Sequence, residues 1–190
     1  MDRGLQGTRM EHYVTILRGI NVSGQKKIRM ADLSKLYESL GLTNVRTYIQ
    51  SGNVVFESIQ GKPDKLVRDI EHAIQKRYGF DVPVLVRTRA ELAAAIRANP
   101  FLKLASIDAS RLHLTFLEQA PEKSVVRKFD PGSLGRDRYS IKDANVYLYC
   151  PDGYGKTRLS NTFLEKQLGV RATTRNWKTV SVLNDLLNKN

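Results

Sequence analysis

Two short polar segments of the chain carry side chains of the kind that bind phosphate or amide groups. Arg18 and Asn21 follow a predicted strand, and Gln50, Ser51 and Asn53 form the turn of a predicted hairpin. Neighbouring strand ends lie close together, so we expect the two segments to converge on one ligand site. A second interpretation stays open. The Gly-Asn pair suits a tight turn by itself, and the arginine suits an internal hydrogen-bonding role.

Tyr48 is predicted to lie on an open face of a sheet. Side chains alternate along its strand, so Arg46, Tyr48 and Gln50 share one side. If helices cover the other side, the tyrosine is exposed between these two residues and beside Tyr13 or Thr15, as base-stacking aromatics are in RNA-recognition modules. The alternative is that this face packs against the second half of the chain, which would bury the ring.

Two basic segments precede predicted helices or lie in loops. Lys26 and Lys27 lie in a polar loop, and Lys156 and Arg158 follow a glycine turn between a strand and a helix. The glycine that a full triphosphate-binding loop requires is replaced by Cys150, which excludes an NTPase loop. The segment is expected either to hold a single phosphate near the helix start or to be a turn with solvated basic residues.

Arg175 and Asn176 precede the last predicted helix. Asn176 or Thr174 suits its N-cap. A cation at a helix N-terminus opposes the helix dipole, so Arg175 is expected to face an anion and becomes a candidate ligand residue.

Standard catalytic sets are absent from the sequence. The histidines, His12, His72 and His113, show no metal-ligand spacing, and the single cysteine, Cys150, excludes a cysteine-rich metal site. Cys150 with His113 is a conceivable nucleophilic pair, but an apolar cysteine at a strand end is more often structural. The sequence predicts no metal and no cofactor.

The net charge is +12, and it divides into +6 for residues 1–100 and +6 for residues 101–190. A field of this sign favours polyanions such as nucleic acid or phosphorylated metabolites. No apolar run reaches the ~20 residues that span a bilayer, and residues 1–11 resemble a flexible leader without the apolar centre of a signal peptide. These features predict a cytoplasmic protein with no membrane partner.

The elements that position these residues follow the order β-α-β-β-α-β in the first half of the chain, the order of a ferredoxin-like module. Periodicity and turn residues predict strands at 12–18, 45–50, 54–56 and 82–88, with helices at 30–40, 64–78 and 90–98.

The order starts again after a break at Asn99-Pro100. Strands are predicted at 111–118, 137–141 and 145–150, and helices at 121–129, 160–168 and 176–187, with the last helix where a fourth strand would be expected. The fold class is α+β: two ferredoxin-like βαββα(β) modules in tandem, at 12–99 and 110–190, the second ending in an extra helix. A single continuous sheet is the alternative.

Several motifs together resemble one bacterial family of conserved proteins, domain of unknown function 1697. They are Leu17-Arg-Gly-Ile-Asn-Val22, Thr47-Tyr-Ile-Gln-Ser-Gly-Asn-Val-Val-Phe56 and Thr173-Thr-Arg-Asn-Trp-Lys-Thr-Val180, with Asn99-Pro100-Phe101 and Gly153-Tyr-Gly-Lys-Thr157 between them. The likeness runs from about Tyr13 to the C-terminus. Ser23 replaces the first of two glycines usual after the first motif, which weakens the expectation that this loop wraps a ligand. The resemblance implies a cytoplasmic α/β fold and no particular reaction.

Three functions fit these observations. The first is binding of a polyanion, RNA or DNA, through the basic loops. The second is an enzyme or sensor for a small phosphorylated or nucleotide ligand bound between the two modules. The third is a structural or partner-binding protein in which the charge only aids solubility.

Overall fold

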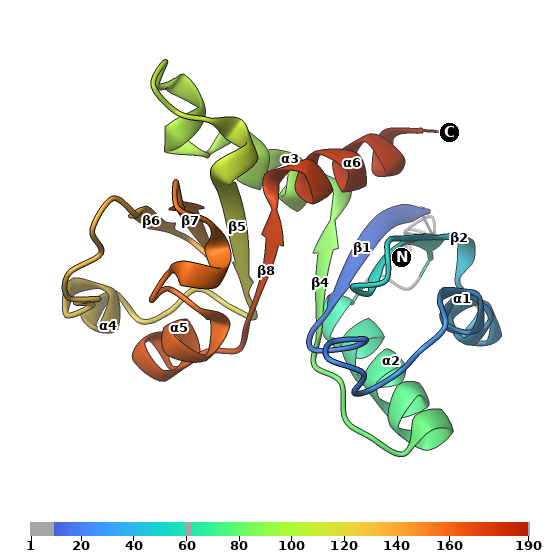
Figure 1. Ribbon diagram of the computed structural model, residues 1–190. Helices are drawn as coiled ribbons and strands as arrows, with labels where there is room; N and C mark the ends of the chain where they lie inside the picture. Colours follow the sequence, from blue (N-terminus) through green and yellow to red (C-terminus); the bar gives the residue numbers. More distant parts are fainter. Residues whose placement is uncertain (1–9, 60–61, 190) are drawn as a thin grey trace, which may run out of the picture. The chain divides into compact units, whose positions relative to one another are not determined.

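The computed structural model describes residues 10–59 and 62–189. The chain divides into two compact units: residues 1–89 with 187–190, here unit 1, and residues 90–186, unit 2. Each unit contains one four-stranded antiparallel sheet (Figure 1), which confirms the predicted α+β class with two ferredoxin-like modules. The sheets are separate, so the alternative of one continuous sheet is wrong. The boundaries 12–99 and 110–190 stay predictions, and the predicted leader falls outside the described residues up to residue 9.

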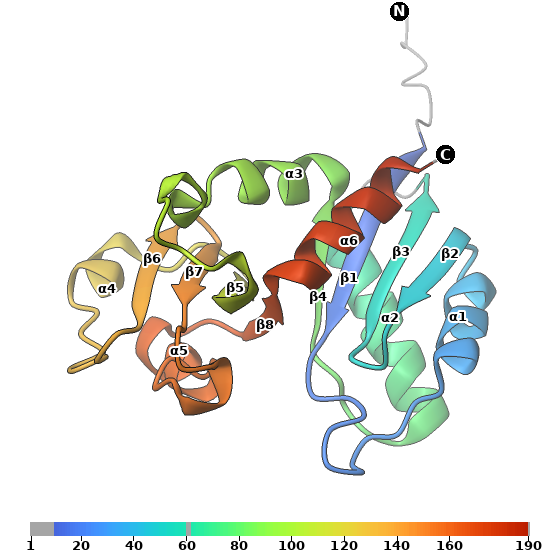
Figure 2. The same cartoon turned by 45° about the horizontal axis from the view of Figure 1, so that its top comes forward.

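The sheet of unit 1 has the strand order β2-β3-β1-β4. Its elements are β1 (Glu11–Leu17), α1 (Met30–Ser39), β2 (Thr43–Tyr48), β3 (Asn53–Ser58), α2 (Pro63–Tyr78) and β4 (Val84–Thr88). Both helices cover the same face of the sheet, as Figure 2 shows, and their buried side chains join one hydrophobic core with those of β1 and β3.

Helical periodicity explains how α2 covers this sheet. Leu66, Ile70 and Ile74 recur at helical spacing and are buried, and Val67 and Ala73 beside them pack partly against the same core. Pro63 begins the helix, where its missing N–H costs nothing, and Gly79 ends it in the left-handed conformation at φ 76°.

The second half of the chain repeats this architecture with strand order β6-β7-β5-β8. Its elements are α3 (Arg89–Arg97), β5 (Leu112–Leu117), α4 (Lys123–Arg127), β6 (Arg138–Lys142), β7 (Asn145–Tyr149), α5 (Asn161–Leu168), β8 (Ala172–Asn176) and α6 (Trp177–Asn188), with short 3₁₀ turns at Pro100–Lys103, Ala109–Arg111 and Tyr154–Lys156. Leu117, Val146 and Leu148 of the sheet form a core with Leu164 and Leu168 of α5.

Strand β8 corrects the sequence analysis, which expected no fourth strand in the second module. It pairs with β5 from His113↔Asn176 to Leu117↔Ala172. Asn176 therefore ends this strand, and α6 begins at Trp177. The strand went unrecognised because its Thr and Asn residues also suit a helix start.

The helices are short. They range from 5 residues in α4 to 16 residues in α2. Within residues 10–59 and 62–189, none has both the length and the apolar character needed to cross a bilayer.

Candidate functional site

The loop after β1 and the turn between β2 and β3 lie together, as the sequence predicts. Asn21 joins them, because its side-chain amide donates to the carbonyl of Gln50 at 2.8 Å and to that of Ile28 at 2.9 Å. Its amide oxygen accepts from the backbone N–H of Ile28 at 2.9 Å. With its hydrogen-bonding groups used in this way, Asn21 shapes the loop rather than binding a ligand directly.

The turn residues also have structural roles. Asn53 is fully buried, and its amide donates to the carbonyl of Tyr48 at 3.0 Å and to the hydroxyl of Ser51 at 2.9 Å. Asn53 therefore fixes the turn, and its burial removes it from the residues that a solvent-borne ligand can reach.

Gly52 brings the two segments into close contact. Its φ is 77°, and a Cβ atom at this position would lie 2.7 Å from Leu17 Cβ and from Ile20 Cδ1. Only glycine satisfies both the backbone conformation and this approach. The backbone N–H of Leu17 also donates to the carbonyl of Gly52 at 2.8 Å, and that of Arg18 donates to Pro83 at 2.9 Å.

A groove of about 830 Å³, which we call the loop groove, opens beside these segments. It is lined by Asn21, Gly24, Lys27, Ile28, Arg29, Met30, Ala31, Asp32, Gln50 and Tyr78. Three residues predicted as ligand residues, Asn21, Lys27 and Gln50, therefore share one cavity. The volume lies within the ~300–1,000 Å³ range of small-molecule sites.

The loop groove is basic at its rim and apolar along one wall. Lys27 is exposed and takes part in no ion pair or hydrogen bond with the residues that the structure describes. Arg29 is also exposed, and its guanidinium lies 3.9 Å from the carboxylate of Asp32, a loose pair. Ile28, Met30 and the ring of Tyr78 supply the apolar wall.

Helix α1 begins at the loop groove. Arg29 is its N-cap residue, and its side chain makes no capping hydrogen bond. The first-turn N–H groups of a helix have no partner within the helix and favour an anion. Asp32 in the first turn offsets part of this field.

Sequence reasoning missed Arg29, Asp32 and Tyr78 as groove residues. Met30 to Tyr37 gave a clear helical pattern, so the helix start was detectable, but Tyr78 ends α2 and reaches the groove only through the tertiary fold. Lys26, by contrast, does not line it. Its ammonium donates to the carbonyl of Asp81 at 2.6 Å, and its φ is 45°.

The expected stacking surface around Tyr48 is not formed. Tyr48 and Arg46 do share the sheet face opposite the helices, but Tyr13 and Thr15 lie on the helix side, where Tyr13 stacks on Phe56 at 5.7 Å. The neighbours of Tyr48 on its own face are buried, and they include Asn53 and Ile16.

Gln50 does not extend this strand either. The strand ends at Tyr48, and Ile49 turns the chain with φ 50°, so Gln50 is an exposed turn residue. Arg46 donates to the carbonyl of Lys189 at 3.3 Å. An open aromatic flanked by two polar groups is therefore absent at this position.

The basic segment at Lys156 lies in unit 2 and is set apart from the helix it precedes. Ser160 caps α5 by accepting from the N–H of Phe163 at 3.3 Å, so one N–H group of that helix end already has a partner. Lys156 and Arg158 are exposed. Thr157 accepts from the N–H of Leu159 at 3.2 Å, which orders the turn.

The side chains of Arg175 and Asn176 also form hydrogen bonds within unit 2. Arg175 is half-buried and donates to the hydroxyl of Thr173 at 3.1 Å and to the carbonyl of Thr174 at 2.9 Å. Burial lowers its pKa to about 10, although the nearby Tyr154 acts in the opposite direction. Arg175 precedes α6 by two residues, as predicted, but it belongs to strand β8, which the sequence did not reveal. Asn176 is the N-cap, accepting from the N–H of Thr179 at 2.8 Å.

Cys150 and His113 do not form an activated pair. Cys150 is fully buried, and burial raises its pKa to about 11, so the thiol stays protonated at neutral pH. His113 stacks on Tyr154 with ring centroids 4.9 Å apart, and burial lowers its pKa. Among residues 10–59 and 62–189, no three His, Cys, Asp or Glu side chains group as metal ligands would.

The fold agrees with that of the proteins to which the chain is similar. Its class is that of α+β proteins with two ferredoxin-like modules in tandem. The chain belongs to the family described as protein of unknown function (DUF1697), whose model matches residues 10–147. Among solved structures it is similar to conserved bacterial protein SP0830 from Streptococcus pneumoniae, at 24% identity and a TM-score of 0.74, over 94% of this chain and 99% of that one. This likeness shows the fold. No curated protein matches the chain.

Proposed function

We propose that the chain binds a small phosphorylated ligand in the loop groove of unit 1. The observation that carries the proposal is the convergence of Lys27, Arg29 and the start of α1 on one cavity that holds a single carboxylate, Asp32. A cation without a protein partner beside a helix N-terminus favours a bound anion.

The ligand has an organic part as well as a phosphate. A cavity of about 830 Å³ is much larger than one phosphate ion, and Ile28, Met30 and Tyr78 offer apolar surface beyond the basic rim. The exposed amide of Gln50, which also lines the groove, adds a donor and an acceptor. A phosphate ester with an apolar or aromatic body fits a groove with a basic rim and an apolar wall.

The test compares two lysine variants that remove the same charge. Lys27→Ala removes the groove ammonium, whereas Lys35→Ala removes an exposed ammonium of α1 that does not line the groove. A panel of adenosine monophosphate, glucose 6-phosphate and phenyl phosphate is screened by thermal shift and then by calorimetry. We expect saturable stabilisation by at least one ester.

Lys27→Ala should weaken the binding of that ester about tenfold or more, because hydrogen bonds to charged groups contribute roughly 1.5–3 kcal/mol. Lys35→Ala should leave the affinity unchanged. Equal losses in both variants would show that only the overall charge matters, and no stabilisation by any ester would refute the proposal.

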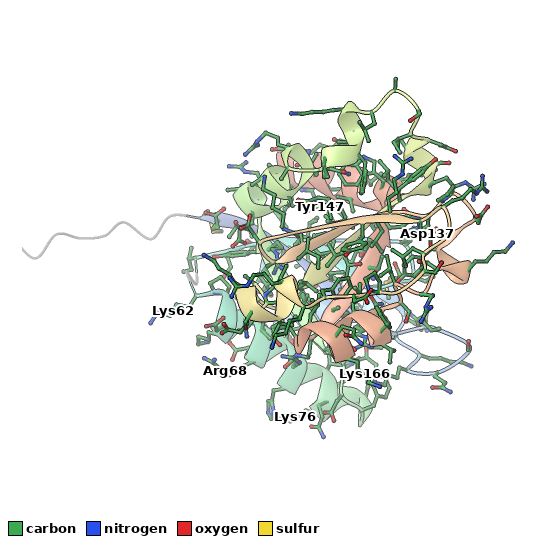
Figure 3. The ribbon with its side chains drawn as sticks, turned by 90° about the vertical axis from the view of Figure 1, so that its left-hand side faces the viewer. Lys62, Arg68, Lys76, Asp137, Tyr147 and Lys166 are labelled. Atoms are coloured by element: carbon green, nitrogen blue, oxygen red, sulfur yellow. The ribbon has the colours of Figure 1, made fainter. Side chains whose placement is uncertain are left out.

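Nucleic-acid binding is a second candidate. The chain carries a net charge of +12, and Figure 3 shows Lys62, Arg68 and Lys76 projecting from α2 and its N-cap. All three are exposed, as is Lys65, but Lys65 pairs with Asp69 at 2.6 Å. A group of solvated cations on one element is suited to a phosphate backbone.

Salt dependence tests this candidate. Fluorescence polarisation is measured with labelled single-stranded RNA, single-stranded DNA and duplex DNA at two salt concentrations. Phosphate contacts release counterions, so binding should weaken steeply with salt, and Arg68→Ala with Lys76→Ala should reduce the slope. A binding constant that hardly changes with salt would contradict it.

We also propose a cytoplasmic location. The chain has one cysteine, Cys150, which is buried and free. A chain without disulfides is typical of a reducing compartment. Fractionation of cells that express the protein, with detection by antibody, checks this directly.

A further inference from the structure

Unit 2 contains a second groove, at the open end of the β6–β7 hairpin. It has a volume of about 450 Å³ and is lined in part by Ser106, Arg136, Asp137, Arg138, Tyr149 and Pro151. We call it the hairpin groove. None of the residues predicted from the sequence to bind a ligand lines it.

Strand register places a guanidinium beside an aromatic ring in this groove. Arg138 and Tyr149 are directly opposite each other in the antiparallel pair β6–β7, so their side chains leave the same face about 5 Å apart. The face is the one opposite the core, because Tyr139 and Leu148, which alternate with them, pack inward. Tyr149 is half-buried and Arg138 is exposed.

Arg138 differs from the other arginines nearby in having no partner within the described part of the chain. Arg136 forms an ion pair with Asp152, with Nε 3.2 Å from Oδ2, and Arg111 lies 3.9 Å from Asp108. Arg138 forms no such contact. Its strand, β6, is an edge strand of the sheet, so nothing in the sheet covers its outer side.

The other polar groups suit a ligand with both donors and acceptors. Asp137, labelled in Figure 3, directly precedes β6 and adds a carboxylate to the lining. The Arg136–Asp152 pair holds the preceding turn, so that Arg136 serves as part of the wall. Together the groove offers an aromatic face, one uncompensated cation and one acceptor.

We propose that the hairpin groove binds a nucleotide. The base stacks on Tyr149, the phosphate lies on the guanidinium of Arg138, and Asp137 accepts from an amino group of the base. This ligand is either a free nucleotide or one nucleotide of a single strand. The site does not depend on the loop groove of unit 1, so either proposal can fail without the other.

The experiment uses the full chain and two probes. Adenosine monophosphate is titrated by calorimetry, and a labelled six-nucleotide oligo(A) RNA is titrated by fluorescence polarisation. Arg138→Ala is compared with Lys142→Ala, which removes the same charge from the same face of the same strand outside the groove. Tyr149→Leu removes the ring, and Tyr149→Phe retains it.

We expect Arg138→Ala and Tyr149→Leu each to weaken binding roughly tenfold or more, and Lys142→Ala and Tyr149→Phe to change it by less than about threefold. Saturable binding of the mononucleotide identifies a free-nucleotide site, and binding of the hexamer alone identifies a nucleic-acid site. Equal effects of Arg138→Ala and Lys142→Ala, or binding of neither probe, overturn the proposal. Unchanged Trp177 fluorescence confirms that each variant is folded; if Tyr149→Leu is not, the Arg138 and Lys142 comparison decides alone.

Discussion

Units 1 and 2 share one strand order but open their grooves at opposite ends of the sheet. In unit 1 the long connection is residues 18–29, between β1 and α1, and the loop groove lies where β1 ends. In unit 2 the connection after β5 is short, residues 118–122, whereas the connection after β7, residues 150–160, is longer. The hairpin groove lies where β7 ends. Since β5 and β7 are antiparallel, connection length, and not strand order, decides where a ferredoxin-like sheet opens.

A buried threonine on each central strand shows a second difference. Thr15 and Thr115 hold equivalent positions, paired with Val54 and Val146 of the neighbouring strand. Thr15 bonds to the hydroxyl of Tyr37 on α1 at 2.7 Å. Thr115 instead bonds to Thr174 on β8 at 2.7 Å.

The two hydroxyls are satisfied by different kinds of element. Thr174 also accepts from Tyr154 at 3.1 Å and donates to Asn161 at 2.7 Å, so unit 2 has a network of side chains, whereas Thr15 in unit 1 bonds to one side chain, Tyr37, and to the carbonyl of Val54 at 3.4 Å. Helix α1 has 10 residues and carries Tyr37, the partner of Thr15. Helix α4 has only 5 residues, and the partner of Thr115 comes instead from strand β8.

The largest difference between the units, in the free energy of unfolding, is expected for substitutions in their hairpin turns. Gly52→Ala in unit 1 combines a left-handed φ of 77° with contacts of 2.7 Å to Leu17 and Ile20, and should lower the free energy of unfolding by about 3 kcal/mol. The corresponding turn of unit 2 uses Asp143 at φ 51°, so Asp143→Gly should change stability by less than about 1 kcal/mol.

Gly41→Ala provides the matched control for this substitution. Its φ is 78°, nearly that of Gly52, but no atom lies within 4 Å of the added Cβ. It should cost about 1 kcal/mol, the conformational part alone. Urea unfolding of the three variants measures these differences, and equal losses for the two alanine variants would show that packing against Leu17 and Ile20 is unimportant.

The next effect compares the stability lost from the Thr15–Tyr37 pair of unit 1 with that lost from the Thr174 network of unit 2. Tyr37→Phe removes the side-chain partner of Thr15 in a fully buried site and leaves only its long bond to the carbonyl of Val54, so it should cost about 2 kcal/mol. Tyr154→Phe leaves Thr174 bonded to Thr115 and Asn161, and should cost less than about 1 kcal/mol. Thermal unfolding monitored by circular dichroism compares them. A larger loss for Tyr154→Phe would contradict the idea that the network shares its hydrogen bonds.

The sequence specified most elements of both units because their patterns are local. Leu66, Ile70 and Ile74 on α2 and the glycine that ends this helix are readable without any tertiary information. The convergence of Asn21 with Gln50 also followed from strand order alone, and it is confirmed by their hydrogen bond.

The errors have physical causes. Every residue from Tyr13 to Leu17 is buried, so alternation along β1 gave no sign of which side the helices cover. Strand β8 has only 5 residues, too few to outweigh cap residues at its end. Tyr78 and Tyr149 reach their grooves through tertiary and cross-strand contacts, which single-sequence patterns do not encode.

The smallest effect concerns alkaline pH, where the stabilities of the two units should begin to fall at different pH values. Burial raises the pKa of Cys150 in unit 2 from 9.0 to about 11, and it raises that of Tyr37 in unit 1 above its ordinary value of 10.0. A group whose folded pKa is raised gives stability that is complete below its unfolded pKa and is lost as the pH rises toward the folded pKa. Unit 2 should therefore begin to lose stability above pH 9, and unit 1 only above pH 10.

The single tryptophan allows the two to be followed separately. Trp177 lies in unit 2 and its fluorescence reports that unit, whereas hydrogen exchange of α1 and α2 reports unit 1. Between pH 8.5 and 10, wild-type protein should lose about 1 kcal/mol more than Cys150→Ala in urea unfolding followed by Trp177, because the variant has no thiol to ionise on unfolding. The same pH dependence in both proteins would show that burial does not raise the pKa of the Cys150 thiol. Loss of protection in α1 and α2 at a lower pH than the change in Trp177 fluorescence would show that unit 1, and not unit 2, is the first to lose stability.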